Sequence, residues 1–368
     1  MTTTSRSSAA GDEAQRSSTN GTAGPDLRAA FHLDTLPRLS RSTVDRREQV
    51  RGDPDHVAAM WPRSRVVRVD PRGRTPVSEA SDGSLSLVDA PAGDFGDTVP
   101  QGAVLLGDED GMPYWGVRVP DPDELPEHFQ NDAGSGFSAV ELWRDLRVSG
   151  GDLDARSAGL LTTAVALLSW HDRSRFCGRD GSPMRSIKAG WAQLCEAHDH
   201  EEYPRTDPSM ICLVHDGADR VLLARQPIWP EGRYSVLAGF VEAGESLEAC
   251  VARECAEEVG VAVSTITYLG SQPWPFPRSL MIGFSAVADP EQTMKLQEGE
   301  IENARWVTRD ELREALAAGD WMTREGEGAR GAQGVGGTAF EAGVDRDLIL
   351  PGGVSIARAM LEAWAAAA

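Results

Sequence analysis

Three glutamates crowd one short segment of the chain. Glu254, Glu257 and Glu258 lie within "GFVEAGESLEACVARECAEEVGV", which runs from Gly239 to Val261. Each carboxylate makes its neighbours harder to ionise unless a cation is bound between them, and oxygen-rich clusters of this kind suit Mg²⁺ or Mn²⁺. A divalent cation can neutralise phosphate oxygens and lower the pKa of a bound water, so the segment is compatible with metal-assisted chemistry on a phosphate.

A helix is expected to present these glutamates. Ser246 suits the N-cap position, and Gly260 suits the residue that ends the helix. On a helical wheel of about 100° per residue, Glu258 falls between Leu247 and Val251, inside the sector that should be apolar. A carboxylate at such a place is costly to the fold. If the segment binds metal, a carboxylate that the metal does not fully engage can take the proton, and we predict that this catalytic base is Glu258.

The alternative for an isolated pattern of this kind is a solvated acidic helix held by ion pairs. Arg253 could pair with Glu257 four residues later, and with Glu245 from the preceding loop. Glu300, in "EGEIENARW", is a further candidate metal ligand because it precedes a strand. Read alone, Glu300 is a surface acid.

Composition limits the partners. The chain has 36 Lys and Arg against 57 Asp and Glu, a formal charge of −21, which repels long nucleic acid but not a small anion brought by divalent metal. Five cysteines form no disulfide framework and fit a reducing, cytoplasmic location. No signal-peptide core and no apolar run of about 20 residues is present, so membrane insertion is not expected.

The chain divides into four predicted pieces. Residues 1–26 are predicted to be a disordered tail, 27–171 an N-terminal α+β domain, 172–206 a short Gly-rich segment with two cysteines, and 207–368 the domain that holds the acidic segment. Strands and helices alternate without a regular parallel repeat, which favours an α+β fold class. The Gly-rich stretch at 325–343 is expected to be a surface loop.

A second stretch could bind a base. "SQPWPFPRS", Ser271 to Ser279, places three prolines around Trp274 and Phe276, which predicts a stiff loop with flat aromatic faces. The alternative is that the same loop packs its aromatic rings into the core.

The acidic segment also matches a known pattern at every position. The pattern is G-x5-E-x7-R-E-U-x-E-E-x-G-U, with U apolar, and the matching residues are Gly239, Glu245, Arg253, Glu254, Cys255, Glu257, Glu258, Gly260 and Val261. It resembles the Nudix box of Nudix hydrolases. The resemblance implies an α/β/α sandwich with a mixed sheet, divalent metal, and hydrolysis of a nucleoside diphosphate linked to another group.

The proline-rich stretch closely resembles the S-Q-P-W-P-F-P-x-S signature of the NADH pyrophosphatase subfamily. "YPRTDPSMI" at 203–211 and "SIARAML" near the C-terminus also resemble that subfamily, and "FC" with "GWAQLC" resembles its zinc ribbon. The resemblance implies a homodimer that hydrolyses NAD(H) to AMP and nicotinamide mononucleotide. It also raises the hypothesis that NAD caps are removed from RNA.

Site residues follow from the resemblance. It implies that catalytic metal binds the carbonyl of Ala238 with Glu254, Glu258 and Glu300, and the acidic cluster itself adds Glu257. Contacts to the nucleotide substrate would come from Tyr203, Phe240, Gln272, Pro273, Trp274, Pro275, Phe276, Pro277, Arg278, Ser279 and Ala357.

The zinc ribbon departs from the subfamily's two C-x2-C pairs. Here the pairs are Cys177-x2-Asp180 and Cys195-x2-His198, so each has lost its second cysteine. These four residues can still form a tetrahedral zinc site, and His200 could substitute for one of them. The alternative is a ribbon held by packing alone, with both cysteines as small buried residues.

Two rivals to NAD(H) hydrolysis stay open. One is a Nudix hydrolase that prefers ADP-ribose or dinucleoside polyphosphates. The other is a noncatalytic nucleotide sensor built on the same fold, against which the intact box argues.

Overall fold

The computed structural model describes residues 31–124, 141–319 and 348–367 of the chain. By internal contacts the chain divides into Met1–Ala30 and Phe31–Ala368, and all described residues belong to the second unit. The predicted tail at 1–26 therefore lies outside the described residues. So does the predicted surface loop at 325–343.

The part before residue 174 contains two small sheets. β1 and β6 run parallel, and the other strand pairs are antiparallel. The first sheet has the order β4 (Ala90–Pro91), β1 (Arg65–Val69), β6 (Met112–Arg118) and β5 (Val104–Glu109). The second has the order β3 (Leu85–Leu87), β2 (Arg74–Glu79) and β7 (Leu142–Asp145). Short helices are α1 (Pro54–Met60) and α3 (Leu146–Ser149).

The longest described helix of this part packs on the first sheet. α4 spans Ala155–Arg173 and begins at Asp154, whose side chain accepts a hydrogen bond from the N–H of Ser157 at 2.9 Å. Leu161 and Leu168 of α4 lie in one buried cluster with Val67 of β1. The helix thus covers the sheet with the face that its sequence pattern predicts.

The next segment is a three-stranded antiparallel ribbon. Two turns with left-handed residues, Gly181 (φ +74°) and Asp199 (φ +53°), follow Cys177 and Cys195 at equal spacing. The ribbon therefore keeps two similar knuckles. Its strands are β10 (Glu201–Glu202), β9 (Ala192–Cys195) and β8 (Met184–Ile187).

A mixed sheet forms the centre of the last part. The strand order is β14 (Ser264–Trp274), β15 (Ser279–Val287), β11 (Asp207–His215), β12 (Arg220–Arg225) and β16 (Asn303–Thr308), and β13 (Leu237–Phe240) pairs with β11. β11 runs parallel to β15 and antiparallel to β12.

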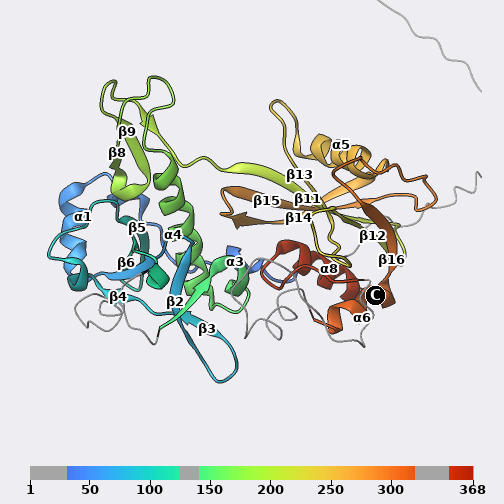
Figure 1. Cartoon of the computed structure of the whole chain (residues 1–368), viewed down its shortest axis with the longest axis horizontal. Coiled ribbons are helices and arrows are strands. Elements are labelled where there is room, and N and C mark those ends of the chain that lie inside the picture. The colour runs from blue at the N-terminus through green and yellow to red at the C-terminus, as the bar shows by residue number, and fades with distance from the viewer. Residues whose placement is uncertain (1–30, 125–140, 320–347, 368) are drawn as a thin grey trace, which may run out of the picture. The chain divides into compact units, whose positions relative to one another are not determined.

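Helices cover both faces of this sheet (Figure 1), which confirms the predicted sandwich. Along β11, Met210 and Cys212 belong to the buried cluster of α5 (Leu247–Val259), whereas Ile211 and Leu213 belong to that of α8 (Ile356–Ala366). Successive side chains of a strand point to opposite faces, so each face needs its own cover. α6 (Arg309–Ala317) contributes to the α8 side.

The remaining cysteines are core residues. Cys212, Cys250 and Cys255 are fully buried in the cluster between the sheet and α5. They pack as small apolar side chains between β11 and the buried face of α5.

Candidate functional site

Local capping sets the ends of α5. Ser246 accepts a hydrogen bond from the N–H of Ala249 at 3.2 Å and starts the helix, as predicted. Gly260 ends it in the left-handed region, with φ of 73°, and its N–H donates to the carbonyl of Ala256. These two caps fix which face of the helix each glutamate occupies.

Glu258 points into the protein, which confirms the helical-wheel prediction. Only 2% of its surface is exposed, and its Oε2 has no hydrogen-bond partner among the described residues. Burial raises the pKa of Glu258 to about 8, and the charges of Glu254 and Glu300 add to the shift. A buried carboxylate in this state favours either a proton or a cation.

Arg253 organises the loop and helix around Glu258. Its guanidinium donates two hydrogen bonds to Glu245, at 2.8 and 2.9 Å, and one to Glu257 at 2.9 Å. It also contacts Glu254 at 3.0 Å and donates to the carbonyl of Phe240 at 3.0 Å. The pKa of Arg253 is raised, mainly by its hydrogen bonds to Glu245. One cation thus joins β13, the loop and α5.

Glu254 lies against the backbone of β13. A Cβ at Gly239 would lie 2.0 Å from both Cδ and Oε1 of Glu254, so only glycine fits there. Burial raises the pKa of Glu254 although Arg253 opposes the shift. Glu254 is therefore partly withdrawn from solvent next to Ala238, the preceding residue of β13.

The carboxylates fit a divalent cation in chemistry and charge. Glu254 and Glu258 are withdrawn from water, and Glu300 is close enough for its charge to raise the pKa of both. Glu257 is 54% exposed and binds Arg253. Within the described residues, no three of these glutamates bring carboxylate oxygens within 4.8 Å of one another. Hard oxygen ligands and an unpartnered Glu258 oxygen are what Mg²⁺ or Mn²⁺ requires.

A cavity of about 240 Å³ adjoins Glu258. Of the residues predicted from sequence, Ala238, Glu258 and Trp274 line it. The prediction missed others that line it as well, among them Arg225, Trp229, Ile301, Met281 and Ile356. The cavity thus combines an acidic edge with aromatic and apolar walls, as small-molecule sites often do.

The missed residues come from separate strands and loops. Trp229 follows β12 in "RQPIWP", a proline-flanked aromatic like the one in "PWPFP", and this similarity was the only signal available. Ser355 and Ile356 line the cavity from the start of α8. The predicted Ala357 does not line it, and lies with Ile356 in the buried cluster beneath that helix.

The proline-rich motif is part strand and part turn. Gln272, Pro273 and Trp274 lie in β14, and Gln272 is fully buried and donates to the carbonyl of Val354 at 3.1 Å. The turn that follows contains Pro275, which is buried. The motif therefore supplies buried residues, as the alternative expects, and Trp274 lines the cavity, while base binding stays a prediction.

The rest of the motif turns into β15. The rings of Trp274 and Phe276 pack edge to face with centroids 5.0 Å apart. Pro277 is exposed, and Arg278 pairs with Asp207 at 2.7 Å. Ser279 begins β15 and pairs across the sheet with both Trp274 and Asp207.

Two predicted substrate contacts are exposed aromatic rings. Tyr203 is 56% exposed and Phe240 is 59% exposed, and neither lines the cavity. Phe240 ends β13 beside the box, and the hydroxyl of Tyr203 bonds with Lys188 at 2.7 Å. In this chain alone, both rings face solvent.

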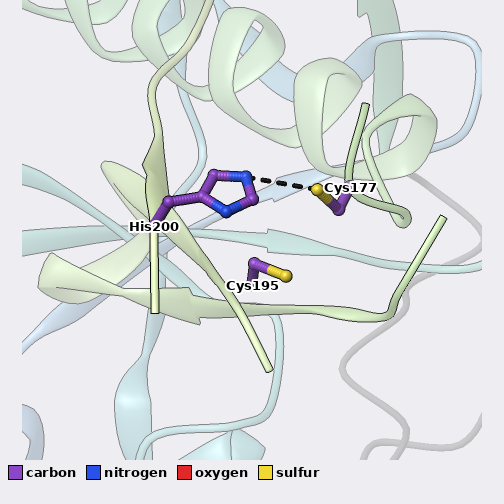
Figure 2. Close-up of side chains that lie close together, drawn as sticks. All are labelled: Cys177, Cys195 and His200. Atoms are coloured by element: carbon purple, nitrogen blue, oxygen red, sulfur yellow. Dashed lines mark hydrogen bonds between the residues drawn. The ribbon is translucent and has the colours of Figure 1, made fainter. Parts of the chain in front are cut away.

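The ribbon brings together one group of metal-ligating side chains, shown in Figure 2. The Sγ of Cys177 lies 3.2 Å from Nε2 of His200, and Cys195 completes a group whose ligand atoms all lie within 4.8 Å. The N–H of Arg179 donates to the Sγ of Cys177 at 3.3 Å. Two thiols and an imidazole suit zinc.

A second group shares Cys195. Asp180 and His198 lie with it, also within 4.8 Å, and the side chains of Asp180 and His198 bond directly to each other. Hydrogen bonding to the N–H of Ser182 is the main reason that the pKa of Asp180 is lowered to about 2. The four residues predicted from sequence therefore fall into two groups that share Cys195, and His200 joins the first of them as an additional candidate ligand.

Family models match three successive parts of the chain. They are described as "NADH pyrophosphatase-like rudimentary NUDIX domain" at residues 54–170, "NADH pyrophosphatase zinc ribbon domain" at 172–203 and "NUDIX domain" at 205–324. With the fold and the box, they define a Nudix hydrolase.

Similar proteins indicate the subfamily of Nudix hydrolases to which the chain belongs. The NAD-capped RNA hydrolase NudC of Mycobacterium bovis is 45% identical over 345 residues, which cover 91% of this chain and 97% of that protein. The human mitochondrial NAD(P)H pyrophosphatase NUDT13 is 47% identical over 174 residues, 47% of this chain and 49% of that protein. The chain belongs to the NADH pyrophosphatase subfamily of Nudix hydrolases.

A solved structure is also similar. The crystal structure of a Nudix hydrolase from Nitrosomonas europaea has a TM-score of 0.32 and 22% identity, and the similarity covers 37% of this chain and 79% of that one.

Among the described residues, no helix combines the length and apolar character needed to cross a membrane.

Proposed function

We propose that this chain hydrolyses the diphosphate bond of NAD(H) to AMP and nicotinamide mononucleotide, and removes NAD caps from RNA. The observation that carries the proposal is the cavity that Trp274, Trp229 and the buried carboxylate of Glu258 all line. A nucleotide base can stack on such rings while its phosphates reach the carboxylates. The names of the relatives support both substrates.

The proposed roles divide between holding metal and moving a proton. Ala238, through its carbonyl, with Glu254, Glu257, Glu258 and Glu300 would hold Mg²⁺ or Mn²⁺. The cation, when bound, supplies charge neutralisation at the phosphate oxygens and activation of water.

Glu258 takes the proton as water attacks one phosphorus, and the bond from that phosphorus to the bridging oxygen breaks. The bridging oxygen leaves on the other nucleotide. Each product is then a 5′-monophosphate, which conserves all atoms of the dinucleotide and one water.

We propose that the substrate contacts come from the residues predicted from the sequence. Trp274 and its neighbours from Gln272 to Ser279 form or support one wall, and Ala357 supports the start of α8. Tyr203 and Phe240 would act in a homodimer, because a second copy could cover rings that are exposed here. The dimer would thus complete the nucleotide site.

The ribbon is proposed to bind zinc through Cys177, Cys195 and His200, with Asp180 as the fourth ligand. The convergence of these side chains supports it. His198 would then orient Asp180 through their mutual bond.

Location in the cytoplasm stays a prediction, supported by five free cysteines.

A substrate panel tests the main proposal. Purified protein is incubated with NADH, NAD⁺, ADP-ribose, a dinucleoside polyphosphate and NAD-capped RNA, each with Mg²⁺ or Mn²⁺, and products are separated by chromatography. We expect the highest kcat/KM for NAD(H). A higher kcat/KM for ADP-ribose would replace this substrate assignment, and no turnover of any substrate would favour the nucleotide sensor.

The RNA activity needs its own comparison, because a net charge of −21 opposes binding to a long polyanion. We expect cleavage of the cap to leave a 5′-monophosphate on the RNA. An uncut cap under conditions that hydrolyse free NADH would remove RNA from the proposal.

A further inference from the structure

We propose that Arg225 is a positioning residue that ties the Trp229 side of the cavity to the segment carrying Glu300. The inference rests on the proposed function, because it concerns the cavity assigned to the dinucleotide. Arg225 is the last residue of β12, lines the cavity, and is only 9% exposed. Across the sheet it pairs with Asn303, the first residue of β16.

The guanidinium of Arg225 holds the loop that follows β12. Its Nη2 donates to the carbonyl of Trp229 at 2.8 Å and to that of Pro230 at 3.3 Å. Ile228, next to Trp229, is 83% exposed, and Pro230 is exposed too, so packing constrains this loop little. Arg225 therefore links the backbone of Trp229 to the sheet through hydrogen bonds from a charged donor, which are stronger than neutral ones.

The same residue holds the segment that leads into β16. Its Nη1 forms an ion pair with the carboxylate of Glu302, and its backbone carbonyl accepts a hydrogen bond from the N–H of Glu302 at 2.9 Å. Ile301, between Glu300 and Glu302, lines the cavity as Trp229 does. One side chain thus fixes two segments at the cavity, and one of them carries a proposed metal ligand.

This double task requires a guanidinium. Arginine offers donors in a rigid planar fork that can serve two partners, whereas the ammonium of lysine is a single point charge. The Nε of Arg225 is buried and has no partner within the described residues. An unpartnered buried donor costs stability, so a gain in folding does not by itself account for arginine here. The geometry points to positioning of the site.

Substitutions at Arg225, Trp229 and Glu302 together distinguish the contact to the Trp229 loop from the contact to Glu302. In Arg225→Met and Arg225→Lys we expect KM for NADH and the Mn²⁺ concentration for half-maximal rate each to rise about tenfold, because a small misplacement of binding groups is costly. Trp229→Ala should raise KM alone. Glu302→Gln should raise the Mn²⁺ requirement alone.

The matched control lies on the same strand. Arg220 begins β12, is 40% exposed and pairs with Asp216, so Arg220→Met should leave KM and the Mn²⁺ requirement unchanged. Melting temperatures measured beside the kinetics detect unfolding. A turnover-independent readout is the Kd of NADH, followed by tryptophan fluorescence, with Arg225→Lys placed in a Glu258→Gln background.

The outcomes distinguish this inference from the proposed function. If wild-type protein hydrolyses no dinucleotide, the proposed function fails, and an unchanged Kd on adding Arg225→Lys to Glu258→Gln then refutes the positioning role too. If wild-type protein hydrolyses NADH while Arg225→Lys keeps its KM, Mn²⁺ requirement and Kd, only the positioning role is refuted. Should Arg225→Met fail to fold, the lysine variant and Glu302→Gln decide.

Discussion

Glu258 lowers the stability of the folded chain through the same burial that suits it to the proposed site. Its pKa is about 8 in the folded chain against 4.5 for an ordinary glutamate, because it is buried near two other carboxylates. The folded state therefore holds the proton more tightly than the unfolded state. Without metal, stability is greatest below pH 4.5 as far as this group decides it, and it is lost as the pH rises toward 8.

Glu258→Gln tests the direction of this pH dependence. In metal-free protein with chelator at pH 8, we expect the variant to melt at a higher temperature than wild type, because its free energy of unfolding is larger by on the order of 2 kcal/mol. With metal added, we expect the variant to show no turnover. Melting temperatures across pH 5–9 measure the difference in stability. The exposed Glu257→Gln is the control, and equal pH profiles for wild type and Glu258→Gln would contradict the buried-charge account.

The ribbon ligands can be separated residue by residue. His200→Ala should lower bound zinc per chain to well under half, because His200 contacts Cys177, whereas His198→Ala should retain most of it. Elemental analysis of purified protein gives the ratio. Loss of zinc in His198→Ala with retention in His200→Ala would reverse the ligand assignment, and absence of zinc from wild type would favour a ribbon held by packing.

Individual residues were predictable where a local rule decides them. The inward position of Glu258 followed from helical geometry, and the Arg253 pairs followed from spacing. Arg225 and Trp229 were missed, because their significance comes from contacts with a loop and a strand distant in sequence. A buried arginine gives no periodic signal of its own.

Among the elements, β13 must approach α5 closely. Gly239→Ala would place a methyl group on the carboxylate of Glu254, so we expect about a hundredfold loss of kcat/KM with a small change in melting temperature. Steady-state kinetics measure it. Gly93→Ala is the control, since nothing lies within 4 Å of a Cβ there. Full activity in Gly239→Ala would mean that Glu254 can move without consequence.

Element boundaries were predicted well where caps set them. Ser246 and Gly260 bound α5 as expected, since capping depends on a few neighbouring residues. The predicted loop at Ser271–Ser279 instead begins inside β14, because pairing with β15 extends the strand to Trp274. Cross-strand hydrogen bonds override the local stiffness of proline when the prolines sit where no donor is needed.

For the whole molecule, assembly is the main prediction. The exposed rings of Tyr203 and Phe240 and the subfamily resemblance lead us to expect a homodimer, with a mass of about twice 39.6 kDa by light scattering at micromolar concentration. Tyr203→Ser should raise KM at unchanged melting temperature. A fully active monomer would contradict both expectations.

The overall architecture was predictable only through resemblance. Apolar patterns indicated strands and helices, but the parallel pairing of β11 with β15 joins segments separated by the whole of α5 and β14. No local pattern reports such a contact, and the cavity walls depend on it. The boundaries at 26, 171 and 206 stay predictions.

The hydrogen bonds of Arg253 affect how fast the proposed site can bind metal. Because β13, the loop and α5 are already joined through this one guanidinium, the chain gives up the freedom of the loop when it folds rather than when a cation arrives. Capture of metal then requires the ion to shed water and Glu258 to give up its proton, but it requires no ordering of this loop. The speed of the first encounter should therefore depend on the identity of the ion and on pH rather than on ordering of the loop.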